Sequence, residues 1–172
     1  MSSCLGWFVL GVIAAILTMV AGAYLFVKTG GVSMETTAKQ FPLEKTLVRL
    51  ALRASIGNAA QQEDPLPFND ANMTEGADIY KEHCAFCHGL PQEPPTFASR
   101  GMFPRPPQLF EQTHMVRDKP EGGMYWKVTH GIRLSGMPGF ESLLSDTQRW
   151  QVTMLVAHAN KLSPTVRTTL SH

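Results

Sequence analysis

The sequence predicts an all-α chain, with an apolar helix near the N-terminus, an amphipathic helix after it and a small helical domain beyond. Three observations predict this class. Residues 5–27 contain no charged side chain, later segments place apolar residues at helical spacing, and no segment shows the alternation typical of a half-buried strand. The 172 residues leave room for one compact domain plus an appendage.

The first element, within residues 1–28, is predicted to cross a membrane once. Its 23 uncharged residues, at about 1.5 Å each, can span a hydrocarbon core of ~30 Å. Trp7 and Tyr24 lie near its two ends, where amphipathic aromatic side chains prefer to sit. The small residues 21–23 would also suit signal-peptide cleavage. Because the apolar run continues past them and residues 1–3 carry no basic charge, we expect an uncleaved anchor.

Residues 29–68 are predicted to form an amphipathic helix, at 42–57, and a linker. Its apolar face is formed by Leu43, Leu47, Leu50 and Ala54. Its basic stripe, at positions i, i+4 and i+8, is formed by Lys45, Arg49 and Arg53. Two interpretations stay open: the helix packs on the following domain with its charges merely solvated, or it meets anionic lipid or a partner subunit. The acidic residues 61–67, with two prolines, are typical of an extended linker.

Charge is unevenly distributed along the chain. The net charge is +3 over residues 28–60, −5 over 61–83 and +3 over 84–172, which gives +1 in total. No segment has the sustained basic surface of a nucleic-acid-binding protein, so we exclude that class.

The third segment, residues 69–172, contains the most informative motif, Cys84-Ala85-Phe86-Cys87-His88. It fits the C-x-x-C-H pattern of covalent haem attachment. Two thiols add to the two vinyl groups of the porphyrin, and the following histidine becomes an axial ligand of the iron. The motif therefore predicts one covalent haem c and a protein that moves electrons.

Two other interpretations of the cysteine pair are weaker. A structural zinc site needs four ligands, and the only other cysteine, Cys4, lies in the apolar segment. A thioredoxin-like pair requires a βαβ setting, and no strand pattern flanks Cys84 and Cys87.

The helices of this segment are predicted from their end signals. Asn72 or Thr74 could cap a helix that runs to Cys84, and a second helix is expected over residues 121–130. Residues 89–119 and 131–144 are predicted to be loops.

The last predicted helix starts at a capping box. Ser145 and Gln148 form the S-x-x-Q signature. We expect this helix to continue through Lys161 and to stop before Pro164.

The order of helix, C-x-x-C-H, proline-rich loop, helix, Gly-Met-Pro and helix resembles class I c-type cytochromes, most closely the monohaem domains of the cbb3-oxidase cytochrome c family. The resemblance covers roughly residues 72–162. It rests on Gly76, Tyr80, Cys84, Cys87, His88, Gly89, Gly131-Ile132-Arg133, Gly136-Met137-Pro138 and Trp150. It implies a class I cytochrome c fold, in which Gly76, Tyr80 and Trp150 match the crossing of the first and last helices.

Met137 is predicted to be the second iron ligand, because the Gly-Met-Pro segment lies 49 residues after His88 and can pass around the haem edge. Met102, in a similar Gly-Met-Phe-Pro context, is the second candidate. Met124 and Met154 are expected to pack in the core, and His130 and His158 to be solvated or packed. Met115 and His114 complete the set of candidates after the motif. Three residues are candidate partners for the haem propionates: Arg105, Trp126 and Arg133.

The resemblance implies a membrane-anchored monohaem cytochrome c. It would carry single electrons from a quinol-oxidising complex or dehydrogenase to a terminal oxidase or another periplasmic acceptor. His/Met ligation fills both axial positions and favours electron transfer over O₂ chemistry, so we expect an electron carrier, not an enzyme, with redox proteins as partners and no small-molecule substrate. The alternatives are a fixed subunit of a larger respiratory complex, and a five-coordinate haem that binds CO or NO or reduces peroxide.

The resemblance also implies a location on the bacterial inner membrane, with the haem domain on the periplasmic side. The positive-inside rule favours the opposite orientation, because Lys28 follows the apolar segment and no basic residue precedes it. We give the site of haem attachment more weight, because long domains cross membranes largely regardless of their charge.

Overall fold

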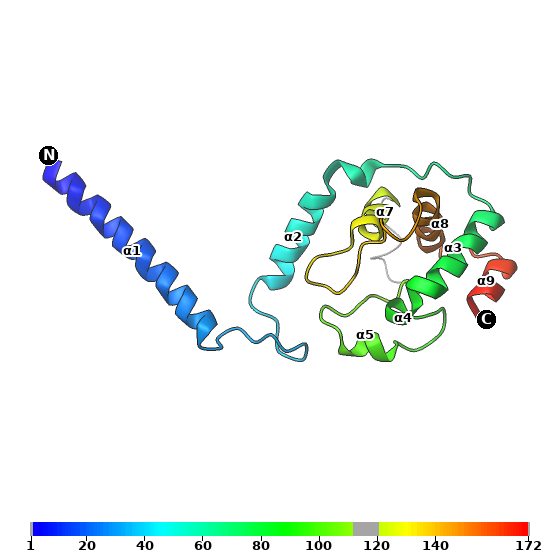
Figure 1. Cartoon of the computed structure of the whole chain (residues 1–172), viewed down its shortest axis with the longest axis horizontal. Coiled ribbons are helices and arrows are strands. Elements are labelled where there is room, and N and C mark those ends of the chain that lie inside the picture. Colours follow the sequence, from blue (N-terminus) through cyan, green and yellow to red (C-terminus); the bar gives the residue numbers. More distant parts are fainter. Residues whose placement is uncertain (1, 112–120, 172) are drawn as a thin grey trace. The chain divides into compact units, whose positions relative to one another are not determined.

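The chain is helical, as predicted, in a computed structural model that describes residues 2–111 and 121–171. Within these residues there is no strand, and the only β-type pairing is an isolated bridge between Ile132 and Met137. The chain divides into two compact units between Pro42 and Leu43 (Figure 1).

The first unit is dominated by the apolar helix α1 (Ser2–Lys28). Residues Cys4–Lys28 have a mean hydropathy of 2.4, and the helix is long and apolar enough to cross a membrane. It ends in a turn in which the backbone N–H groups of Thr29 and Gly31 donate to the carbonyls of Leu25 and Phe26.

The second unit begins with α2 (Glu44–Ile56), which continues into a short 3₁₀ helix, η1 (Gly57–Gln61). The predicted start of α2 at Pro42 is wrong by two residues. Leu43 has a φ of 68°, in the left-handed region, so the helix begins only after it.

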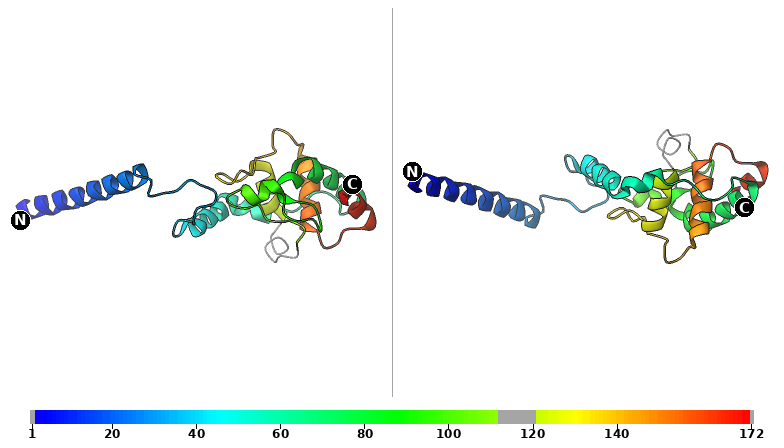
Figure 2. Two further views of the ribbon diagram at one scale, coloured as in Figure 1. Left: turned by 90° about the horizontal axis from the view of Figure 1, so that it is seen from below. Right: turned by 90° about the horizontal axis from the view of Figure 1, so that it is seen from above.

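The core of the second unit lies between four longer helices (Figures 1 and 2). They are α3 (Asp70–His83), α7 (Glu121–His130), α8 (Asp146–Ala157) and α9 (Pro164–Ser171). Two short helices, α4 (Ala85–His88) and α5 (Phe97–Gly101), lie between α3 and α7 in the chain. α3 packs against α8 and α9, and α7 packs against α8 and η1.

α3 and α8 approach each other at a glycine. A Cβ on Gly76 would overlap the carbonyl oxygen of Gln151 and would lie 3.3 Å from the Cβ of Leu155. Tyr80 and Trp150, one on each helix, are almost fully buried. The predicted crossing of the first and last helices is therefore present, although the Trp150 ring stacks on Tyr125 of α7, with ring centroids 3.9 Å apart.

Several helix ends differ from the predicted ones. Asn69, not Asn72 or Thr74, caps α3, because its side chain accepts from the N–H of Asn72 at 2.9 Å. α7 has the predicted bounds, and the capping box of Ser145 and Gln148 is present at the start of α8. α8 ends at Ala157, four residues early.

Pro164 begins a helix, α9, that was not predicted. A proline fits the first turn of a helix as well as it stops one, because its missing N–H has no intrahelical partner there.

η1 packs closely on α7 at Gly122. The next residue, Gly123, has more space around it. A Cβ on Gly122 would overlap the carbonyl oxygen of Ala59 and would lie 2.8 Å from the backbone nitrogen of Gln62. On Gly123, the nearest atom would be Cγ2 of Ile56, at an ordinary 3.9 Å.

We therefore expect Gly122→Ala to destabilise the unit by about 2 kcal/mol, because the backbone of η1 must move away. Gly123→Ala is the matched control and should be neutral or stabilising by up to about 1 kcal/mol, from helix propensity alone. Denaturant unfolding of the purified full-length variants measures both. Equal stabilities would show that η1 is not packed on α7 in this way.

Candidate haem site

The two motif cysteines lie at the end of α3 and on the single turn of α4. Cys84 is the last residue before α4, and its carbonyl accepts from the N–H groups of Cys87 at 3.1 Å and His88 at 2.9 Å. This helical turn places side chains three and four residues apart on one face. Both thiols are free of disulfide bonds. Burial, with a smaller contribution from Cys87, raises the pKa of the Cys84 thiol to about 12.

His88 is oriented by a backbone carbonyl. Its Nδ1 lies 2.8 Å from the carbonyl oxygen of Pro107. A carbonyl can only accept, so Nδ1 carries the proton and Nε2 keeps its lone pair. Burial lowers the pKa of His88, against the smaller opposing effect of this hydrogen bond, and therefore favours the neutral imidazole that a metal requires. Such second contacts fix the orientation of ligating histidines. Sequence reasoning did not identify Pro107, and no local pattern points to it.

The chain just after the motif packs against α3. The hydroxyl of Tyr80 donates to the carbonyl of Gly89 at 2.7 Å, and the ring of Phe110 meets the Tyr80 ring edge-on, with centroids 4.9 Å apart. Gly89 has a φ of +72°, and a Cβ there would overlap Oε1 of Gln108. Residues 107–110 therefore hold the motif from one side.

Met137 lies on a loop that closes on itself. The N–H of Ile132 donates to the carbonyl of Met137 at 3.1 Å, and the Ser135 hydroxyl donates to the carbonyl of Ile132 at 2.6 Å. A Cβ on Gly131 would lie 2.6 Å from the carbonyl oxygen of Met137 and from the backbone nitrogen of Gly139. The two ends of the loop therefore meet at the C-terminus of α7, and only glycine allows this approach.

The chain that follows this loop is held in place by contacts with α7 and α8. The N–H groups of Phe140 and Glu141 donate to the last carbonyls of α7, at 2.9 Å and 3.2 Å. The guanidinium of Arg149, almost wholly buried, donates to the carbonyl of Leu144 at 2.7 Å and to Asp146 at 3.1 Å. The sequence did not single out Arg149.

Comparison with known families identifies part of the chain. The family model described as "Cytochrome C oxidase, cbb3-type, subunit III" matches residues 71–154. This stretch, just under half of the 172 residues, is similar to that family. The match includes the cysteine motif, α7 and the Met137 loop. No curated protein is similar enough to the chain to give a match.

The donor set of this cytochrome domain fits a covalent haem c, the cofactor that the family implies. Two unpaired thiols lie on one helical turn, and the next residue is a histidine with its Nε2 free of the contact made by Nδ1. Among the described residues there is no cluster of three or more His, Cys, Asp or Glu that could hold a metal ion by itself.

Met102 lies next to the Met137 loop. Its Cε would be 2.7 Å from a Cβ on Gly136. Sequence reasoning named Met102 only as the second candidate ligand and did not identify this proximity. Met124 and Met154 are in the core, as expected, whereas His114 and Met115 lie outside the described residues.

The three candidate propionate partners lie in different surroundings. Arg105 and Arg133 are exposed, and Trp126 is half-buried with its ring 5.0 Å from that of His130. Their role toward a propionate stays a prediction.

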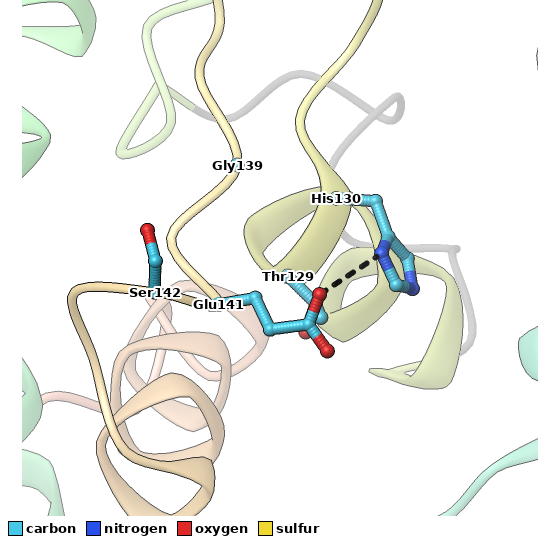
Figure 3. Close-up of a pocket in the computed structure, with 5 residues that line it drawn as sticks. All are labelled: Thr129, His130, Gly139, Glu141 and Ser142. Carbon is cyan, nitrogen blue, oxygen red and sulfur yellow. Dashed lines mark ion pairs between the residues drawn. The ribbon is translucent and has the colours of Figure 1, made fainter.

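A surface hollow lies beside the end of α7 (Figure 3). It is lined by Thr129, His130, Gly139, Glu141 and Ser142, and Nδ1 of His130 lies 3.9 Å from Oε2 of Glu141. None of these residues belongs to the haem donor set, so the hollow is separate from the proposed ligands.

Gly136 offers a direct test of the Met137 loop. Its φ of +73° disfavours any side chain, and a Cβ would crowd Met102. We expect Gly136→Ala to cost about 2 kcal/mol in stability, from backbone strain plus contact. In a Met102→Ala background the contact is gone, so the same substitution should cost only about 1 kcal/mol. Unfolding curves of the four proteins measure this difference, and an equal cost in both backgrounds would contradict the contact.

Proposed function

We propose that the chain is a membrane-anchored monohaem cytochrome c that passes single electrons between a quinol-oxidising complex or dehydrogenase and a terminal oxidase or another periplasmic acceptor. The observation that carries this proposal is the hydrogen bond from His88 to Pro107, which leaves Nε2 for iron within a family-matched cytochrome c domain. Haem c supplies a one-electron Fe(III)/Fe(II) couple when bound.

The protein's own residues have separate tasks in this proposal. Cys84 and Cys87 would hold the porphyrin covalently, while His88 and Met137 would ligate the iron and keep O₂ from binding it. Arg105, Trp126 and Arg133 are proposed to pair with the propionates. α1 is proposed to keep the haem domain at the periplasmic face of the inner membrane. Its length and apolar composition support a single span.

A second candidate is a fixed electron-transfer subunit of a larger respiratory complex. The description of the matching family, a subunit of an oxidase, favours it. Purification from native membranes in mild detergent separates the two candidates, because only a fixed subunit would keep its partners.

The main test uses full-length protein in membranes. We expect one covalent haem per chain, no CO binding by the reduced form at neutral pH and no peroxide consumption. Alkaline carbonate should leave the protein in the membrane, and intact mass should show that residues 2–28 remain. CO binding at pH 7 would instead indicate a five-coordinate haem, and a mature N-terminus at Tyr24 would indicate a cleaved signal peptide.

A further inference from the structure

α2 exposes an aliphatic surface that none of the described residues of its own unit covers. None of its residues is buried, and Leu47 and Leu50 are 61% and 57% exposed. Leu43, just before the helix, is 70% exposed, and Val48 is 45% exposed. A stripe of this kind, sustained over a 13-residue helix, is more than the scattered surface leucines of an ordinary soluble domain.

This stripe points away from the rest of the second unit. At 100° per residue, Leu47 and Leu50 lie on the side of α2 roughly opposite Leu52 and Ile56. Leu52 and Ile56 are half-buried, and Cγ2 of Ile56 would be 3.9 Å from a Cβ on Gly123 of α7. The contact between α2 and the cytochrome domain is therefore made near the C-terminal end of the helix, and the leucine stripe faces away from it. Lys45, Arg49 and Arg53 lie on the same side of α2 as Leu52 and Ile56 but are exposed.

The polar side of α2 is basic. It carries Lys45, Arg49 and Arg53, and the only acidic residue of the helix is Glu44, in its first turn. A helix with leucine on one face and Lys or Arg on the other is typical of segments that lie in the plane of an anionic bilayer surface. The exposed apolar residues of the helix are Leu, Val and Ala only. Of the residue types enriched at the centres of protein interfaces, α2 therefore carries Arg but neither Trp nor Tyr.

The chain connection limits how far α2 can move from a membrane. Residues 29–43 separate α1 from α2, and an extended chain of that length reaches at most about 50 Å. If α1 spans a bilayer, the tether therefore keeps α2 within about 50 Å of the bilayer surface.

From the exposure, direction and charge of this helix, we propose that α2 docks on an anionic lipid surface, with Leu43, Leu47 and Leu50 at the level of the acyl chains and Lys45, Arg49 and Arg53 attracted to lipid phosphates. This goes beyond electron transfer, because it assigns a second membrane contact, distinct from α1.

Docking of α2 would also orient the cytochrome domain. η1 is packed on α7 at Gly122, so α2 and the haem-bearing helices belong to one compact unit. The Met137 loop lies at the same end of this unit as α2 in each view (Figures 1 and 2). A docked α2 therefore turns that end toward the bilayer.

The experiment compares a nitroxide spin label on α2 with one at a control position on α9. In full-length haem-loaded protein carrying Cys4→Ser, Leu47→Cys is labelled on α2. Thr168→Cys, exposed on α9, is the matched control. The proteins are reconstituted in vesicles of phosphatidylcholine alone or with a quarter of phosphatidylglycerol, and the haem is kept reduced so that the iron is diamagnetic. The readout is the accessibility of each label to O₂ and to a water-soluble nickel complex.

We expect the label at position 47, but not the one at 168, to gain O₂ accessibility and lose nickel accessibility in the anionic vesicles. Changing Lys45, Arg49 and Arg53 together to Gln should weaken docking about fivefold per cation removed. The proposal is overturned if label 47 stays as accessible to nickel as label 168, or if the triple variant is protected equally well. It is also overturned if protection appears only in native membranes, which would indicate a protein partner. The haem spectrum reports separately on the electron-transfer proposal.

Discussion

Replacing Met137 with alanine should convert a six-coordinate haem into one with an open axial position. We expect the long-wavelength charge-transfer band of a Met–Fe(III) haem to disappear and the reduced protein to bind CO at neutral pH. The thioether is a soft, neutral ligand that favours Fe(II). Its loss should therefore lower the reduction potential by on the order of 0.1–0.3 V, within the ~0.8 V range that axial ligands cover. Absorption spectra and a redox titration measure both effects.

Met102→Ala is the matched control, because its Cε lies next to the same loop, against Gly136. We expect it to keep the charge-transfer band and to exclude CO. If the band survives in Met137→Ala and is lost in Met102→Ala, then Met102 is the ligand and the assignment of Met137 is wrong.

The second large effect is expected at the crossing of α3 and α8. A Cβ on Gly76 would lie 2.8 Å from the carbonyl carbon of Gln151, so Gly76→Ala must push two helix backbones apart. Unlike a flexible side chain, a helix backbone cannot yield locally. We expect a loss of about 3 kcal/mol in stability, visible as a lower denaturant midpoint.

The helical control for this substitution is again Gly123→Ala, where a Cβ meets only an ordinary contact. If Gly76→Ala is no more destabilising than Gly123→Ala, then α3 and α8 are not in backbone contact. Loss of the haem spectrum together with stability would show that this crossing also supports the site.

Elements with strong local signals could be predicted from the sequence. The capping box of Ser145 and Gln148 gave the start of α8, and residues 121–130 gave α7. α5 and α9 were missed because α5 is only five residues long and α9 begins at a proline that was interpreted as a stop.

For the site, too, residues defined by a local motif could be predicted, whereas long-range contacts could not. Cys84, Cys87 and His88 are adjacent in sequence, so their chemistry was visible in the motif. The contacts of Pro107 with His88 and of Met102 with Gly136 join residues 19 and 34 positions apart through irregular loops. No periodic pattern records such contacts, because they depend on how the loops fold over the helices.

The proposed iron ligand Met137 lies on a closed loop that is inserted between two fixed points of the fold. Both of its ends are anchored at the end of α7 by Gly131 and Gly139, and the chain that follows satisfies the last carbonyls of that helix. The ends of the loop are thus held by contacts with α7. A substitution of the Met137 side chain can therefore alter the electrochemistry while the helices keep their packing.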